Sequence, residues 1–342
     1  MKRWTTLLAG ASVCVAALGG CGSDSSSSSD SSADSDPTST EAAAQAANGE
    51  SESESGSGSG PETGAVAGDA TESAVAEAGP EAQADVDQTP PSGINGIAVA
   101  GSTLYVASIN SNQVLGIDAA TGAIVGRWGT GGELGGPDDL VVDQDGTLLV
   151  AGFGTGAVSR IAIDGTITEL GNVGAGANPI NLSPAGELFV GRALTGDGLY
   201  RYDAEGKKFV EVTPTTQGLN GFDFSDDGSI IGPLLDFTKP GRIARVDPDS
   251  GDIEVLVDGL GAVTGVEVDG DVIYAAQVAP PALLRMSLQD PDSPPATVAE
   301  LPFASDNIAL GADGTVYATS FSTPEIAAIS PAGDVRLISI GA

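Results

Sequence analysis

Histidine is absent from all 342 residues of this sequence. Its absence excludes Ser-His-Asp and Cys-His catalysis and removes the commonest ligand of zinc, copper and iron sites. The two cysteines, Cys14 and Cys21, lie within the first 21 residues, so the rest of the chain has no disulfide or thiol chemistry. A bound metal would therefore be a hard cation held by oxygen ligands, such as calcium or magnesium.

Basic residues are scarce, with 13 Lys and Arg against 47 Asp and Glu, and the formal net charge is −34. Residues 93–342 hold 11 basic residues (13 less Lys2 and Arg3) and 32 acidic ones (47 less the 15 of residues 22–92), a net charge of −21. Such a charge argues against nucleic acid or anionic lipid as a partner of this part. A cation, a basic protein or a neutral small molecule remains as a candidate ligand.

The chain begins like a bacterial lipoprotein precursor. Lys2 and Arg3 precede an apolar run, Trp4 to Ala17, that is short for a membrane span and typical of a secretory signal peptide. The following Leu18-Gly19-Gly20-Cys21 resembles a lipobox, in which the Cys becomes the lipidated first residue. We expect a signal peptide over 1–20 and a lipid anchor at Cys21 on the extracytoplasmic face of the bacterial cell envelope. The alternative is an ordinary cleaved signal peptide with an incidental Cys.

Residues 21–92 have the composition of a disordered tether. Positions 22–92 contain 15 acidic and no basic residues among Ser, Gly, Ala and Pro, and they contain no aromatic residue. Such a segment cannot bury enough apolar surface to offset the entropy of ordering it, and its like charges repel. We interpret it as a spacer that holds a folded domain away from the membrane. Recruitment of a basic partner by the acidic segment is the alternative.

Residues 93–342 repeat one unit six times. The last apolar residue of the first strand recurs at spacings of 43, 40, 42, 44 and 42, at Val99, Val142, Leu182, Phe224, Val268 and Leu310. A period in the forties with several short strands per copy predicts a β-propeller with one four-stranded blade per copy. The fold class is therefore all-β, a six-bladed β-propeller. The last blade is complete in itself, so we expect the ring to close by side-chain packing, and we expect a monomer.

A polar residue stands four positions before each aligned apolar residue. The six are Asn95, Asp138, Asn178, Asn220, Thr264 and Asp306. In a propeller the innermost strands line the central channel, so these residues would gather at one mouth of it and offer oxygen ligands suited to calcium. The alternative is that each only caps a turn. We take all six as candidate ligand-binding residues, and Asn95, Asp138, Asn178, Asn220 and Asp306 as candidate metal ligands.

The motifs around these positions carry a resemblance to a known family. Residues 219–225, reading LNGFDFS, and residues 178–186, reading NPINLSPAG, resemble the fourth- and third-blade motifs of the SMP-30/gluconolactonase/strictosidine-synthase-like superfamily of six-bladed propellers, and NHL-type propellers have similar phrases. The resemblance implies a divalent cation held by a Glu, two Asn and an Asp that also acts as general base. Asn178 and Asn220 match the two Asn ligands, whereas Asn95 stands in place of the Glu and Thr264 in place of the Asp.

These departures leave the activity open, because Thr264 cannot act as a carboxylate base. One hypothesis is an anchored lipoprotein that binds a small molecule or a protein at the channel mouth, with a divalent cation, calcium above all, as a candidate cofactor. A second is a calcium-dependent hydrolase of a lactone or related ester, with Asp138, Asp236 or Asp306 as the catalytic carboxylate. A third is a structural surface protein with a plugged channel. Asp236 has its own alternative, an ion pair with Lys239 or Arg242.

Overall fold

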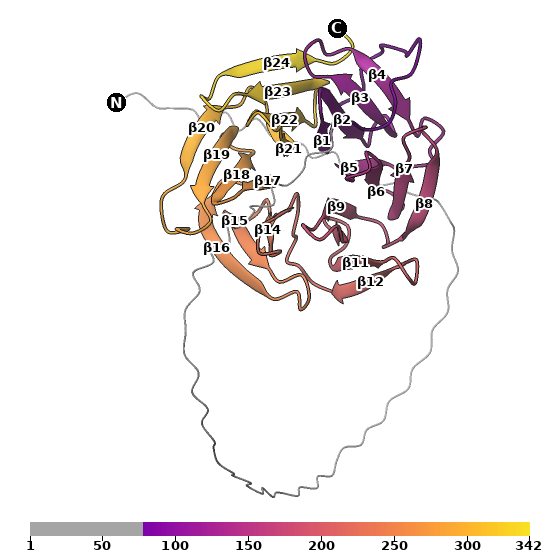
Figure 1. Cartoon of the computed structure of the whole chain (residues 1–342). Helices are drawn as coiled ribbons and strands as arrows, with labels where there is room; N and C mark the ends of the chain where they lie inside the picture. Colours follow the sequence, from indigo (N-terminus) through magenta and orange to yellow (C-terminus); the bar gives the residue numbers. More distant parts are fainter. Residues whose placement is uncertain (1–77) are drawn as a thin grey trace, which may run out of the picture. The chain divides into compact units, whose positions relative to one another are not determined.

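The structure is a computed structural model, and it describes residues 78–342. These residues form 24 β-strands in six sheets, and each sheet holds four strands that are consecutive in the sequence. The sheets stand as blades around a central axis (Figure 1). The six-bladed propeller predicted from the repeat is therefore confirmed. The predicted signal peptide, Cys21 and the tether up to residue 77 lie outside the described residues.

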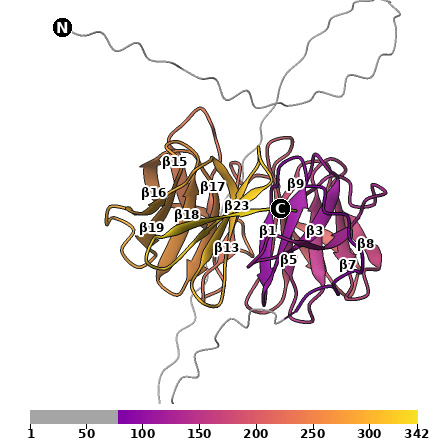
Figure 2. The ribbon, with the colours of Figure 1, turned by 90° about the horizontal axis from the view of Figure 1, so that it is seen from above.

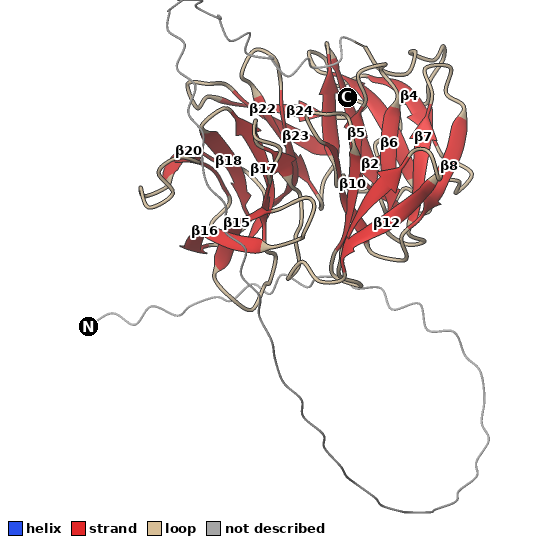
Figure 3. Cartoon of the chain, turned by 60° about the horizontal axis from the view of Figure 1, so that its bottom comes forward, coloured by secondary structure: helices blue, strands red, loops and turns tan. Residues whose placement is uncertain are grey.

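In every blade the first strand is innermost and the next three follow outward, paired antiparallel. The strands of the first three blades are β1 (Ile97–Ala100), β2 (Thr103–Ser108), β3 (Gln113–Asp118), β4 (Ile124–Trp128); β5 (Pro137–Val142), β6 (Leu148–Gly152), β7 (Ala157–Ile161), β8 (Ile167–Asn172); β9 (Ala177–Leu182), β10 (Leu188–Arg192), β11 (Leu199–Asp203) and β12 (Lys208–Thr213). Those of the last three are β13 (Asp223–Phe224), β14 (Ile230–Pro233), β15 (Gly241–Val246), β16 (Ile253–Leu260); β17 (Val263–Asp269), β18 (Val272–Gln277), β19 (Ala282–Ser287), β20 (Ala296–Glu300); β21 (Ser305–Leu310), β22 (Val316–Ser320), β23 (Glu325–Ile329) and β24 (Val335–Ser339). Figures 2 and 3 show the blades from other sides, with only strands and loops in the coloured part.

The core is divided into six apolar clusters, one at each seam between neighbouring blades. Successive side chains of a strand point to opposite faces, so Val106 packs in the seam with blade 6 and Ala107 in the seam with blade 2. This arrangement explains why the second strands are apolar nearly throughout, since both of their faces are covered. Within residues 78–342 no helix is long and apolar enough to span a membrane.

The ring closes where blade 6 meets blade 1, without exchange of a strand. Ile326 and Ile338 of blade 6 pack against Ile97 and Leu115 of blade 1, and the Ile94 N–H donates to the Ser320 carbonyl at 3.0 Å. Both sheets at this seam are built from their own consecutive strands. The expectation of closure by side-chain packing is therefore confirmed.

Residues 78–92, which the sequence assigns to the tether, lie against blades 1 and 2, and residues 83–88 among them run along the outer edge of β4. The Gln88 side-chain amide accepts from Ile124 N–H at 2.9 Å and donates to Ile124 O at 2.8 Å. Gln83 makes the same pair of bonds with Arg127, at 3.2 and 3.0 Å. Val86 packs against the cluster between blades 6 and 1. Two glutamine amides thus replace a neighbouring strand and satisfy backbone groups of an edge that would otherwise be open.

Candidate functional site

The positions that face the channel form three layers, which are defined by their place along the inner strands. Each layer contains polar residues. The mouth layer, four residues before the aligned apolar position, is the predicted set Asn95, Asp138, Asn178, Asn220, Thr264 and Asp306. The middle layer follows one residue later and holds Gly96, Asp139, Pro179, Gly221, Gly265 and Asn307. The hairpin-end layer, beside the turns that lead to the second strands, holds Ala98, Val141, Asn181, Asp223, Glu267 and Ala309.

The mouth layer coincides with irregular strand pairing. The register of β5 against β6 shifts between Pro137 and Asp139, and that of β17 against β18 shifts between Val263 and Gly265. The extra residue in each shift is a mouth residue, Asp138 or Thr264. Because a bulged residue leaves the regular alternation of the strand, mouth and middle residues can both be directed toward the axis.

Within the mouth layer the structure joins two carboxylates to two amides. Asn95 Nδ2 donates to Asp306 Oδ2 at 2.8 Å, and Asn95 Oδ1 accepts from the Ile109 backbone N–H at 3.2 Å. Burial and the nearby charges of Asp306 and Asp139 raise the pKa of Asp138 well above its usual range, while a hydrogen bond from Asn178 lowers it. Burial also raises the pKa of Asp306. Asp138 and Asp306 are therefore close enough to repel each other.

The other two mouth residues are held by backbone groups. The Thr264 hydroxyl donates to the Ser305 carbonyl at 3.0 Å and so ties blade 5 to blade 6. The Asn220 backbone N–H donates to the Pro233 carbonyl at 3.0 Å, and its side chain is buried. Among residues 78–342 no three or more Asp, Glu, His or Cys side chains gather closely enough to hold a metal ion.

Asp236 belongs to a loop after β14 and forms the ion pair that was its alternative interpretation. Its Oδ2 lies 2.7 Å from Lys239 Nζ, and its Oδ1 accepts from the Thr238 hydroxyl at 2.6 Å. Hydrogen bonds from Lys239 and Thr238 lower the pKa of Asp236, so it is ionised at neutral pH. The interactions found for Asp236 lie within its own loop.

The middle layer is crossed by a hydrogen bond between blades 6 and 2. Asn307 Nδ2 donates to Asp139 Oδ1 at 2.9 Å. The two side chains occupy the space above two glycines: a Cβ on Gly265 would lie 2.4 Å from Asn307 Oδ1, and a Cβ on Gly96 would lie 2.6 Å from Asp139 Cα. The middle layer therefore needs glycine at positions 96 and 265, where any side chain would collide with Asp139 or Asn307.

Asp139 is also a tie between blades 2 and 3. Its Oδ2 accepts from the Ile180 N–H at 3.1 Å, and its Oδ1 accepts from the N–H of the next residue, Leu140, at 2.9 Å. Burial raises the pKa of Asp139 to about 7 against the effect of these bonds. With three donors on its two oxygens, Asp139 has about one acceptor position left.

Asp223 repeats this pattern at the hairpin-end layer. Its Oδ1 accepts from Asn181 Nδ2 at 3.1 Å, and its Oδ2 accepts from the Val268 N–H of the next blade at 2.9 Å. The Phe224 N–H also donates to Oδ1, at 2.7 Å. Burial raises the pKa of Asp223 to about 6 despite these donors. Asn181 and Asp223 together link blades 3, 4 and 5.

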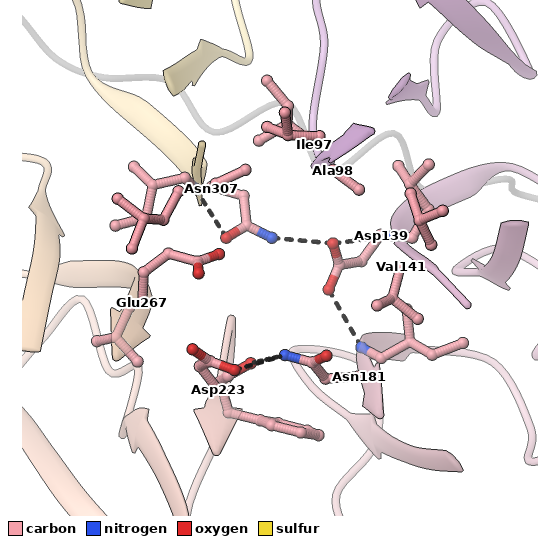
Figure 4. A pocket seen from close by; sticks show the side chains of 17 residues that line it. Ile97, Ala98, Asp139, Val141, Asn181, Asp223, Glu267 and Asn307 are labelled. Atoms are coloured by element: carbon pink, nitrogen blue, oxygen red, sulfur yellow. Dashed lines mark hydrogen bonds between the residues drawn. The ribbon is translucent and has the colours of Figure 1, made fainter. Parts of the chain in front are cut away.

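Glu267 occupies in blade 5 the position of Asp223 in blade 4, but it is one methylene longer. Its partner in the next blade is the Leu310 N–H, and a hydrogen bond from that group lowers the pKa of Glu267. Burial and the charges of Asp223 and Asp139 raise the pKa of Glu267 well above its usual range. Its carboxylate points into the channel (Figure 4), and it has fewer hydrogen-bond donors than Asp223, one against three.

A cavity of about 180 Å³ lies between the Asp139–Asn307 bond and the hairpin end of the channel. Its wall includes Asp139, Asn181, Asp223, Glu267 and Asn307 (Figure 4) and continues to the ends of the inner strands at Val99, Val142 and Leu310. None of the six mouth residues lines it. The channel thus offers two distinct places, the mouth layer and this cavity, on the two sides of the Asp139–Asn307 bond.

Sequence reasoning selected the mouth layer and missed the five polar residues of the cavity. The same alignment contained them, because Asn181, Asp223 and Glu267 stand directly before their aligned apolar residues in blades 3 to 5. Asp139 and Asn307 share a second position, whose counterparts Gly96, Gly221 and Gly265 lack side chains. Polar residues at two further positions of one repeat would have indicated a channel lining.

No protein-family model matches this sequence, and no curated protein matches it. Solved structures share its fold. A streptogramin B lyase superposes with a TM-score of 0.56 at 16% identity, over 73% of this chain and 84% of that one. A putative gluconolactonase gives 0.54 at 16%, over 77% and 96%. Regucalcin of Agrobacterium tumefaciens, described as a calcium-binding protein, gives 0.55 at 18%, over 71% and 87%.

At such identities the likeness concerns the fold alone. This chain has the propeller architecture that is also found in gluconolactonase-type and regucalcin structures. The resemblance inferred from the third- and fourth-blade motifs is confirmed at that level.

Proposed function

We propose that this chain is a lipid-anchored binding protein whose propeller channel receives a positively charged ligand. One observation carries the proposal: five carboxylates of the channel have raised pKa values, and none of the ion pairs found among residues 78–342 involves any of them. They are Asp138, Asp139, Asp223, Glu267 and Asp306. Buried carboxylates without a cationic neighbour are costly, and a bound cation would relieve that cost.

A divalent cation is the first ligand to test, at the mouth layer. Asp138 and Asp306 supply two carboxylates, and Asn178 and Asn220 supply amide oxygens, which are the ligand types that calcium prefers. Asn95 fits less well, since its oxygen accepts from the Ile109 N–H and its nitrogen faces Asp306. Calcium at this layer would require the Asn95 side chain to turn over. The calcium-binding description of regucalcin supports the proposal by likeness of fold only.

Calorimetric titration with calcium chloride tests the mouth site. We expect heat of binding with the wild-type chain and little or none with the double variant Asp138→Asn/Asp306→Asn. The exposed pair Asp226→Asn/Asp313→Asn is a matched control for lost charge and should bind like the wild type. Equal binding by both double variants would remove the mouth layer as the calcium site.

Catalysis is the second candidate, favoured by the mutual repulsion of Asp138 and Asp306. Two carboxylates that repel each other can divide the roles of general acid and general base, since one keeps its proton while the other ionises. The substrate would be a lactone or related ester. A panel of lactones assayed with and without a chelator tests this candidate, and hydrolysis that Asp138→Asn leaves unchanged would contradict it.

The anchor is a separate part of the proposal and rests on the sequence around Cys21. Lipidation there would place the propeller on the extracytoplasmic face of the bacterial cell envelope. Labelling with a radioactive fatty acid in a bacterial host, followed by membrane fractionation, tests it. The wild-type chain should carry label in the membrane fraction, whereas Cys21→Ser should carry none, and equal labelling of the two would refute the anchor.

A further inference from the structure

We infer that the cavity at the hairpin end of the channel binds a small primary ammonium compound, with Glu267 as its counter-ion. The inference rests on the proposed function, the uptake of a positively charged ligand by the channel. It adds the class of ligand and a place on the far side of the Asp139–Asn307 bond from the mouth layer. Three features of the cavity support it: an available carboxylate, an asymmetric wall and a limited volume.

The available carboxylate is that of Glu267. The corresponding Asp223 accepts a hydrogen bond from the next blade, at 2.9 Å from the Val268 N–H, and so works as a tie. Glu267 has one donor among residues 78–342, the Leu310 N–H of its own next blade, whereas Asp223 has three, from Asn181, Phe224 and Val268. Figure 4 shows its carboxylate directed into the cavity. A carboxylate in this position has acceptor capacity that the fold itself does not use.

At the hairpin-end layer the wall of the cavity is polar on one side and apolar on the other, while Asp139 and Asn307 form its inner end. Glu267, Asp223 and Asn181 come from blades 5, 4 and 3, whereas Ala98 and Val141 come from blades 1 and 2 (Figure 4). A ligand with a charged head and a hydrocarbon body matches both sides at once. The head would face Glu267, and the body would cover the small apolar side chains.

Size and geometry favour an ammonium group over a bare metal ion. A cavity of about 150 Å³ in another protein holds benzene, so the 180 Å³ found here accommodates a molecule slightly larger. The carboxylates of this cavity are too dispersed to hold one metal ion together. An ammonium group carries three N–H donors that point in different directions. It can bind Glu267 and also reach the remaining acceptor position of Asp223 or Asp139.

The probe is cyclohexylamine, which is positively charged at neutral pH, and its matched neutral control is cyclohexanol. Calorimetric titration of the full chain with each compound measures affinity. We expect cyclohexylamine to bind and cyclohexanol to bind at least about tenfold more weakly, because the alcohol lacks the charge-assisted hydrogen bond. Glu267→Gln keeps the shape of the side chain and should lose about tenfold or more in affinity for the amine. Glu300→Gln, an exposed change at the end of β20, should lose nothing.

Proton release gives a second readout of the same site. Because burial and the charges of Asp223 and Asp139 favour the protonated form of Glu267, binding of a cation should expel that proton into the buffer. The measured heat should then depend on the ionisation heat of the buffer for the wild type, and much less for Glu267→Gln. A fold check by circular dichroism ensures that each variant is folded before titration.

Equal binding of the amine by wild type and Glu267→Gln would overturn the inference, and so would equal affinity for amine and alcohol. If calcium binds at the mouth but cyclohexylamine does not bind at all, the ligand class assigned to this cavity fails while the proposed function stands. If neither cation binds to the wild type, both fail together. The mouth variant Asp138→Asn/Asp306→Asn should retain binding of cyclohexylamine if the two places are separate.

Discussion

Asn307 and Asp139 are 168 positions apart in the sequence, yet their side chains form a 2.9 Å hydrogen bond across the channel. Asn307 belongs to the first strand of blade 6 and Asp139 to the first strand of blade 2, so the bond passes over blade 1, where Gly96 leaves room for it. The bond links blade 6, near the C-terminus, to blade 2, near the start of the propeller. It also divides the mouth layer from the cavity beyond it.

Asn307→Ala tests the contribution of this bond to stability. The change removes one donor from a buried carboxylate and also removes the acceptor of the Ile308 N–H, which lies 2.9 Å from Asn307 Oδ1. We expect the free energy of unfolding to fall by about 1–3 kcal/mol, measured by denaturant titration. Gln144→Ala, at an exposed turn position, is the control and should change it by less than about 0.5 kcal/mol. Similar effects of the two changes would contradict the role of the bond.

The channel glycines should not tolerate a methyl group. A Cβ on Gly96 would lie 2.6 Å from Asp139 Cα, which is backbone and cannot move aside easily. We expect Gly96→Ala to destabilise the chain by about 1–3 kcal/mol through overpacking. Gly131→Ala is the matched change in a place where the added methyl meets only the end of the exposed Glu133 side chain. Thermal unfolding of the two variants compares them, and an equally stable Gly96→Ala would show that the layer is looser than described.

Stability should fall as pH rises from about 4 to about 7. The pKa values of Asp139 and Asp223, about 7 and about 6, lie above the value of about 3.9 expected in the unfolded chain. Between these limits the folded state holds more protons than the unfolded state, so each step up in pH favours unfolding. We expect the melting temperature to decrease over this window. A melting temperature that is constant or rises from about pH 5 to about pH 7 would contradict the raised pKa values.

Asp139→Asn should reduce the slope of that pH profile. The amide cannot ionise, so the part of the slope above about pH 6 should diminish. The variant should also be less stable, because its NH₂ replaces one carboxylate oxygen and then faces either the Ile180 N–H at the Oδ2 position or the Leu140 and Asn307 donors at the Oδ1 position. Melting curves over a pH series for both proteins measure the slope. Asp143→Asn, in a hairpin turn outside the channel, should leave the slope above about pH 6 unchanged.

Gln83 and Gln88 should protect the outer edge of blade 1. Their side chains accept from the backbone N–H groups of Arg127 and Ile124. In the double variant Gln83→Ala/Gln88→Ala, hydrogen exchange at these two amides should become faster, because an edge strand without a neighbour exposes its N–H groups. Gln144→Ala, in an exposed turn, should leave both rates as they are. Unchanged exchange in the double variant would mean that the segment does not cover the edge in solution.

In the mouth layer, alignment of the repeats predicted the positions of the polar residues but not their hydrogen-bond partners. The alignment that placed Asn95 and Asp306 in one ring was right about their neighbourhood, since they share a 2.8 Å hydrogen bond. It treated both as free ligand groups, although Asn95 uses its oxygen and its nitrogen within the protein. A repeat places residues at equivalent heights, but it does not say where each polar atom finds its partner.

By itself, the sequence determined the number of blades, the four-strand unit and the closure of the ring without strand exchange. These follow from local regularities: a period in the forties, strands apolar on both faces, and a last repeat complete in itself. Tertiary structure alone decided which polar groups are ties and which are available. Asp223 and Glu267 hold equivalent positions in the repeat, yet Asp223 has three hydrogen-bond donors whereas Glu267 has one, and the Glu267 carboxylate points into the cavity. Because Asn181 and Val268, two of the donors to Asp223, belong to the neighbouring blades, that difference depends on how the closed ring sets the blades side by side.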